Sequence, residues 1–180
     1  MSALAVAVQQ ALGADLIGTD AGFGSETLDV EPARWSDAAR AARGAGATYF
    51  DLLAAYDLGA DELAVVAHLS RPDASEHLLL RTRVAAGGAV PTLVDVYAGA
   101  AWHEREAHEM LGVGFTGHEP LEPLLLDPSA PATPLRKDVL LMARPTTPWP
   151  GDKDPADSTG RPRRRTPPPG VPADWPREGS

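Results

Sequence analysis

The densest group of chemically active side chains lies in the stretch WHEREAHEMLGVGF at residues 102–115. Two histidines and three glutamates surround one arginine within residues 102–109. Imidazole and carboxylate groups are common zinc ligands and also common general acids and bases. The stretch therefore raises three possibilities: a metal site, an acid–base site, or a charged helix that holds something other than a substrate.

Helical spacing argues against a metal site. Gly112 ends a predicted helix over Ala101–Leu111, in which each residue turns the chain by about 100°. His103 and His108 then diverge by about 140°, whereas the zinc motif HExxH needs histidines four residues apart. His118 could join them only through the following loop. A stand-alone metal-dependent enzyme that uses His103, His108 and His118 is therefore the less favoured alternative.

The carboxylates of the same predicted helix do not converge either. Glu104 and Glu106 lie about 200° apart around the axis, with Glu104 at the border of the apolar face, so they cannot act as a carboxylate pair. Arg105 and Glu109 form an i,i+4 pair on the opposite face, beside Trp102. A solvated amphipathic helix would not need this tryptophan, and Trp and Arg are the residues that most often anchor interfaces. The pattern favours a helix between its own domain and another protein.

The segments that must position this helix have the patterns of an α/β (α+β) domain. Helices are expected at 2–12 and 32–44, and strands at 26–32, 49–57, 62–69 and 76–84. The turn-forming sequence SRPDAS makes the last two strands an antiparallel hairpin. Thr92 and Asp95 have the spacing of a capping box and favour a helical turn. We expect a small mixed or antiparallel sheet with flanking helices.

Proline content divides the chain near residue 119. Ten of the 18 prolines lie in residues 144–180, and five more lie in residues 120–134. Because proline lacks an N–H and favours extended neighbours, we expect no regular elements from Glu119 onward. We predict an α/β domain at 1–118, an extended partner-wrapping arm at 119–143, and a proline-rich, disordered tail at 144–180.

The totals exclude several classes of function. Cysteine is absent, which removes disulfides, thiol catalysis and cysteine-ligated iron–sulfur clusters. The net charge is −9, and the basic excess is confined to residues 144–180, so nucleic acid is not an expected partner. No basic leader precedes the first apolar run, and no run approaches the roughly 20 apolar residues of a membrane span. We expect any membrane association to go through a partner.

Four motifs occur in order and carry a resemblance: W-x-E-R-E at 102–106, G-V-x-F-x-G-H at 112–118, L-x-x-L-L-L at 121–126 and P-L-R-K-D at 134–138. Over roughly residues 50–142 the chain resembles the thirty-kilodalton subunit family of bacterial NADH:quinone oxidoreductase (respiratory complex I), whose members form the C-type component of that complex. Departures at His108, Glu109 and Leu111 mark a divergent member. The first 45 residues and the tail carry no resemblance.

The resemblance implies a non-catalytic scaffold in the peripheral arm of the complex, on the cytoplasmic face of the cell membrane. Its partners would be the quinone-site (D-like) and iron–sulfur (B-like and I-like) subunits of the same complex. FMN, iron–sulfur clusters and quinone would belong to those partners, with no cofactor, catalytic residue or metal in this chain. Electrons would pass from NADH to quinone with proton translocation. The alternatives are the equivalent subunit of a ferredoxin-fed or membrane-bound [NiFe] hydrogenase complex, and a generic adaptor.

The same resemblance assigns the motif residues to assembly and packing. The predicted interface residues are Trp102, Glu104, Arg105, Glu106, Gly112, Phe115, Gly117, His118, Pro134, Leu135, Arg136, Lys137 and Asp138. Of these, Arg136 is expected to form a bidentate, charge-assisted hydrogen bond with one carboxylate.

Overall fold

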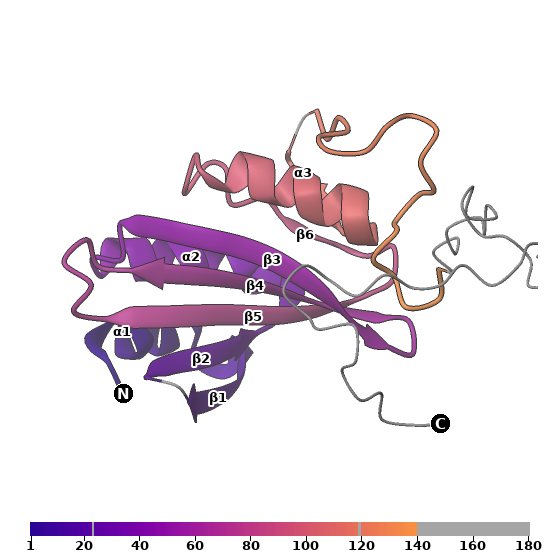
Figure 1. The fold of residues 1–180 in the computed structure, drawn as a ribbon. Coiled ribbons are helices and arrows are strands. Elements are labelled where there is room, and N and C mark those ends of the chain that lie inside the picture. The colour runs from indigo at the N-terminus through magenta and orange to yellow at the C-terminus, as the bar shows by residue number, and fades with distance from the viewer. Residues whose placement is uncertain (23, 119, 140–180) are drawn as a thin grey trace, which may run out of the picture. The chain divides into compact units, whose positions relative to one another are not determined.

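A five-stranded sheet organises the residues that the computed structural model describes, which are 1–22, 24–118 and 120–139 (Figure 1). Its strands are β1 (Leu16–Gly22), β2 (Ser25–Val30), β3 (Tyr49–Gly59), β4 (Glu62–Ser70) and β5 (His77–Ala85). Their order is β1-β2-β5-β4-β3. The β2–β5 pair is parallel and the other three pairs are antiparallel, so the predicted mixed sheet is confirmed.

The β4–β5 hairpin forms the centre of the sheet, as predicted. Leu63 pairs with Val84 and Leu69 pairs with Leu78, so the alternating apolar residues of both strands share one face. The side chains on this face are buried, including Leu78 and Leu80. Because successive side chains of a strand point to opposite faces, the intervening Arg81 and Arg83 lie on the other face.

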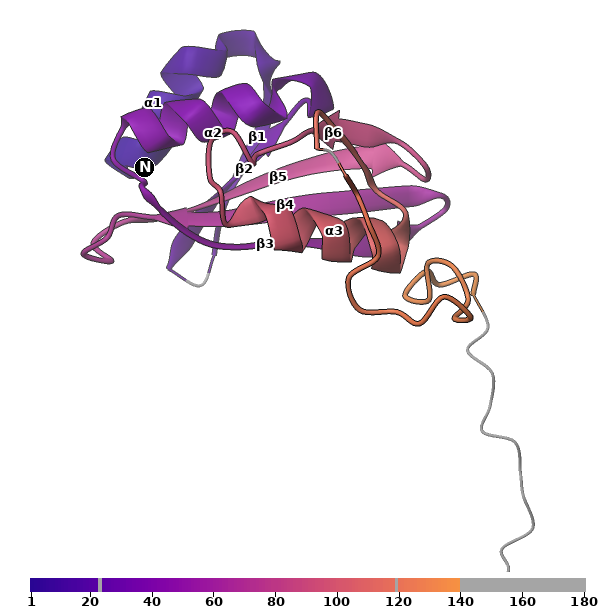
Figure 2. The same cartoon turned by 90° about the horizontal axis from the view of Figure 1, so that it is seen from above.

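Two N-terminal helices cover part of the apolar face. Helix α1 (Ala3–Leu12) begins after Ser2, whose hydroxyl accepts a hydrogen bond from the Ala5 N–H at 3.2 Å. A short 3₁₀ turn, η1 (Gly13–Asp15), follows it, and a second, η2 (Pro32–Arg34), leads into α2 (Trp35–Gly44). In Figure 2, α1, α2 and α3 lie on the same side of the sheet. The apolar face of each helix therefore closes the core against the strands.

Helix α3 (Ala100–Leu111) packs against β3 and carries the charged stretch. It ends at Gly112, which has φ +80° in the left-handed region that favours glycine. A small parallel sheet of β6 (Ala89–Pro91) and β7 (Gly114–Thr116) flanks it. The sequence predicted α3 and its glycine stop but none of β1, β6 and β7.

Residues 120–139 follow without helix or strand, as predicted, and pass close to the C-terminal end of α3 (orange in Figure 1). We call this segment the arm. The predicted tail at 144–180 and the end of the predicted arm at 140–143 lie outside the described residues, and the domain boundaries remain a prediction. Within the described ranges, no helix is long and apolar enough to span a bilayer.

Candidate partner-binding site

The carboxylate of Glu104 is the most deeply buried charged group of the charged stretch. Its side chain is 0% exposed. Thr92 Oγ1 donates to Oε2 at 2.6 Å, and the Leu93 N–H donates to Oε1 at 2.6 Å. His118 Nδ1 lies 3.0 Å from Oε2. One side chain of α3 therefore ties the turn after β6 to the chain that follows β7.

This burial corrects the predicted place of Glu104 at the border of the apolar face. It also changes the predicted capping box: the turn at 93–97 is present, but Glu104 caps it in place of Asp95. The reason is that Thr92 and Leu93 supply donors that make burial of a carboxyl group tolerable. Burial raises the pKa of Glu104, and the hydrogen bonds from Thr92, Leu93 and His118 offset only part of that effect.

Arg105 and Glu109 hold the arm rather than each other. Arg105 Nε donates to the carbonyl of Glu122 at 2.9 Å, and its Nη2 donates to the carbonyl of Pro123 at 2.7 Å. The Glu109 carboxylate accepts the N–H groups of Leu125 at 2.8 Å and Leu126 at 2.9 Å. The predicted i,i+4 ion pair is therefore corrected. The backbone of the arm offers both carbonyls and N–H groups, and each charge binds the group of complementary polarity.

Trp102 and Glu106 remain available on the outer side of α3. The Trp102 side chain is 70% exposed, the highest value among the large apolar side chains of the described residues. Glu106 is also exposed, which agrees with its predicted divergence from the buried Glu104. A tryptophan placed in this way is a typical anchor for a protein partner.

Arg136 fixes the end of the arm to the turn between β3 and β4. Its Nη2 lies 3.2 Å from Asp61 Oδ1, and its Nε lies 3.5 Å from Asp57 Oδ2 and 3.2 Å from Asp138 Oδ1. The Arg136 side chain is only 10% exposed. The predicted bidentate bond to one carboxylate is wrong: the guanidinium spans three, because the tight turn at Ala60–Asp61 brings two of them together.

Two arm contacts shift the pKa of their carboxyl groups downward. The backbone N–H groups of Lys137 and Gly59, with help from Arg136, lower the pKa of Asp57. Burial alone would raise the pKa of Glu109, but the N–H groups of the leucine-rich segment outweigh it and lower that pKa. Both carboxylates therefore bind the arm in their ionised form.

The three histidines considered as metal ligands go to separate partners. His103 Nδ1 lies 3.1 Å from the Leu53 carbonyl, and His108 Nδ1 lies 2.8 Å from the Val113 carbonyl. His118 binds Glu104 instead. Across residues 1–22, 24–118 and 120–139, no group of three His, Cys, Asp or Glu side chains could hold a metal ion. The geometry gives no support to the metal-dependent alternative.

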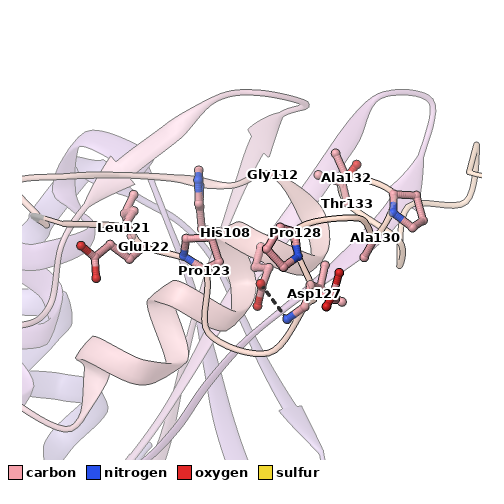
Figure 3. Close-up of a pocket in the computed structure, with 13 residues that line it drawn as sticks. His108, Gly112, Leu121, Glu122, Pro123, Asp127, Pro128, Ala130, Ala132 and Thr133 are labelled. Atoms are coloured by element: carbon pink, nitrogen blue, oxygen red, sulfur yellow. Dashed lines mark hydrogen bonds between the residues drawn. The ribbon is translucent and has the colours of Figure 1, made fainter.

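The arm encloses a pocket beside the end of α3. Its volume is about 320 Å³, and residues 121–133 form its wall over a floor of His108, Glu109 and Gly112 (Figure 3). The lining is mainly apolar and includes Pro123, Pro128 and other prolines and leucines. The charged pair of α3 therefore shapes a hollow surface on the arm.

The other predicted interface residues differ in exposure. Phe115 is buried in β7, so it can act on a partner only by supporting the surface. Gly117, Lys137 and Asp138 are exposed, and Pro134 is half-buried. Leu135 is 60% exposed, while its N–H donates to the Met110 carbonyl at 3.1 Å.

Sequence reasoning missed the residues that receive these groups. Asp57 and Asp61 bind Arg136, and Thr92 binds Glu104. The only available signal for the first two was a pair of acids around the turn-forming sequence LGAD at 58–61.

The four sequence motifs thus meet in one place, since both arm motifs are bound to α3 or to the β3–β4 turn. The sequence pattern of the family described as the respiratory-chain NADH dehydrogenase 30 Kd subunit matches residues 28–145. The chain belongs to this family.

Curated relatives of the family agree with this assignment. The C-type NADH-quinone oxidoreductase subunit from Rhodopseudomonas palustris (strain BisB18) is 32% identical over 143 residues, which cover 77% of this chain and 72% of the relative. The protein of the same name from strain TIE-1 is 32% identical over 126 residues, 67% of this chain. The chain spans 62% of the length of that relative.

Solved structures share the fold. The trypsin-resistant fragment of Nqo5 matches with a TM-score of 0.55 and 21% identity, covering 65% of this chain and 98% of the fragment. A chain of the membrane-bound sulfane sulfur reductase, an archaeal respiratory membrane complex, matches with a TM-score of 0.66 and 25% identity. That match covers 82% of this chain and 94% of the other. The predicted fold class is confirmed.

Proposed function

We propose that this chain is a scaffold subunit in the peripheral arm of an NADH:quinone oxidoreductase and contributes binding surface rather than chemistry. The observation that carries the proposal is the use of the charged groups of α3. Glu104 is buried among three hydrogen-bonding groups, and Arg105 and Glu109 bind the backbone of the arm. These groups shape a surface and are not directed at a common point where a substrate could react.

The proposed binding surface combines the outer side of α3 with the arm. Trp102 and Leu135 supply exposed apolar area, while Arg136 fixes the arm to the β3–β4 turn. The partner we propose is the quinone-site subunit, with the iron–sulfur subunits beside it. These partners would hold FMN, iron–sulfur clusters and quinone, and the chain would reach the cytoplasmic face of the membrane through them.

The alternative is an equivalent subunit of a complex fed by ferredoxin or linked to a [NiFe] hydrogenase. The likeness to the sulfane sulfur reductase chain is compatible with this alternative but does not favour it. The curated relatives carry the NADH-quinone oxidoreductase name. We therefore propose NADH as the donor, with electron transfer to quinone coupled to proton translocation.

Affinity purification of the tagged chain from detergent-solubilised membranes tests the proposal. We expect iron–sulfur, quinone-site and membrane subunits to co-purify, and mass spectrometry of the donor subunits identifies the electron source. A Trp102→Ala variant should recover less of them than a control such as Ile17→Ala, which also removes an exposed apolar side chain but on β1. Recovery of the wild-type chain alone, from the cytosolic fraction, would contradict the proposal.

A further inference from the structure

The pocket enclosed by residues 121–133 has the size of a site for one side chain. Its volume of about 320 Å³ exceeds the roughly 150 Å³ of an apolar cavity that holds benzene. It lies at the lower limit of the roughly 300–1,000 Å³ of pockets for drug-sized ligands. A flavin or a quinone with its tail would need more space, whereas a large aliphatic or aromatic side chain would fill it.

The pocket wall is fixed before any occupant arrives. Arg105 holds the carbonyls of Glu122 and Pro123, and Glu109 holds the next two N–H groups that face it. At the other end of the loop, the Leu135 N–H donates to the Met110 carbonyl. A wall held in this way costs little further conformational entropy on binding, which favours affinity.

The chemistry of the lining selects the occupant. Leucine, proline and alanine side chains make most of the wall, so an apolar group is favoured inside. Glu122 and Asp127 add negative charge at the rim, and His108 is the basic group that lines the pocket. Proline has no N–H, so the three prolines of the wall leave it richer in acceptors than in donors. A cationic donor beside the apolar group would match both features.

The outer surface of the same loop points to a protein rather than a small molecule. Leu125 lies between pocket-lining residues in sequence, yet its side chain is 60% exposed. A small ligand inside the pocket would leave Leu125 in water. A polypeptide that lies over the loop would cover it while placing one side chain inside.

We infer that this pocket receives one aliphatic or aromatic side chain of a partner protein, flanked in that partner by a lysine or arginine that meets the acidic rim. The inference rests on the proposed function for the existence of a partner. It adds the place where the partner is anchored and the sequence type that recognises it.

Site-specific photo-crosslinking in the full-length chain tests the inference. The photoreactive residue p-benzoylphenylalanine replaces Ala132, which lines the pocket, and in a control replaces Asp20, exposed on β1 at the far edge of the sheet. After irradiation of cells and purification through the tag, mass spectrometry identifies the crosslinked peptide. From Ala132 we expect a partner peptide with a large apolar residue and a lysine or arginine within two positions. Glu122→Lys should lower the crosslink yield about tenfold, and Asp20→Lys should not.

The outcomes separate this inference from the proposed function. If respiratory subunits co-purify but position 132 gives no crosslink, an acidic peptide, or a second copy of this chain, the inference is wrong and the proposed function stands. The same holds if Glu122→Lys and Asp20→Lys have equal effects. If no respiratory subunit co-purifies, the proposed function fails, and the peptide crosslinked at 132 still decides what the pocket binds.

Discussion

Glu104 illustrates at the scale of one residue how a charged motif can serve structure. Its carboxyl group accepts hydrogen bonds from Thr92 and Leu93 and lies against His118, all in the interior. These partners belong to the turn after β6 and to the chain after β7. A buried carboxyl group with satisfied partners fixes the relative position of three segments, and removing it leaves those partners unpaired.

We therefore expect Glu104→Ala to lower the free energy of unfolding by roughly 2–4 kcal/mol, since it leaves a buried hydroxyl and a buried N–H without an acceptor. Glu104→Gln should cost less, because its amide oxygen still accepts while its NH₂ group replaces one acceptor with a donor. Urea unfolding of both variants measures the difference. An alanine variant as stable as the glutamine variant would show that the hydrogen bonds contribute little.

The pH dependence of stability should carry the signature of the same carboxyl group. Burial raises the pKa of Glu104 above the ordinary 4.5, so the folded state retains the proton at pH values where the unfolded chain has lost it. The stability from Glu104 is thus complete below pH 4.5 and is lost as pH rises through the folded pKa, with a slope of at most about 1.4 kcal/mol per pH unit.

Glu104→Gln removes this slope, because glutamine does not titrate. The measurement is the free energy of unfolding of both proteins at a series of pH values from 4.5 upward. We expect the advantage of wild type over the glutamine variant to shrink with rising pH. An advantage that grows over this range would mean that the folded state favours the ionised carboxylate.

The burial of Glu104 could not be predicted from the sequence of its helix. Angular spacing placed it at the border of the apolar face, because only its neighbours in the helix were considered. Its donors lie 11, 12 and 14 residues away along the chain. Glu106, which has no such partner among the described residues, was correctly predicted to diverge from it. Tertiary partners decide where a carboxylate lies when its angular position is intermediate.

At the scale of elements, α3 and the arm form one unit through backbone contacts. Arg105→Ala removes both donors to the carbonyls of Glu122 and Pro123, and Glu109→Gln weakens the bonds to the N–H groups of Leu125 and Leu126. We expect amide hydrogen exchange at Leu125 and Leu126 to accelerate about tenfold in either variant, while exchange in β4 is unchanged.

Glu106→Gln is the matched control, since Glu106 lies on the same helix and is exposed. It neutralises one carboxylate of α3, as Glu109→Gln does, and it should leave exchange in the arm unchanged. Equal acceleration in Glu106→Gln and Glu109→Gln would mean that the overall charge of the helix, and not the specific contact with the arm, protects Leu125 and Leu126.

Strong periodicity made most elements predictable, and its absence explains the strands that were missed. The β4–β5 hairpin alternates over nine residues in each strand, and α3 has a glycine stop. By contrast, β1 has the sequence LIGTDAG, whose glycines and aspartate are poor strand formers; it forms by pairing with β2. Strands β6 and β7 have three residues each, too few for any alternation to be read.

At the scale of the whole molecule, the arm links parts that are distant in sequence. Its Leu121 packs against the core, Leu135 binds the end of α3, and Arg136 reaches the β3–β4 turn. The sequence predicted an apolar, proline-rich segment that would need a surface to lie on. It could not predict that much of this surface belongs to the chain itself, because the contacts are mostly with backbone groups, which leave no pattern in the sequence.

Two truncations separate the arm from the tail. A chain that ends at Ala143 lacks only the polar, proline-rich residues 144–180, which have little apolar surface to bury, and it should keep the melting temperature of the full chain. A chain that ends at His118 also loses Leu121 and the partners of Arg105 and Arg136. Its free energy of unfolding should fall by about 1–3 kcal/mol, mainly through lost apolar burial. Thermal and urea unfolding of the three chains measure both effects. A large loss on truncation at Ala143 would assign the tail a structural role, and no loss at His118 would mean that the arm stabilises only the complex with its partner.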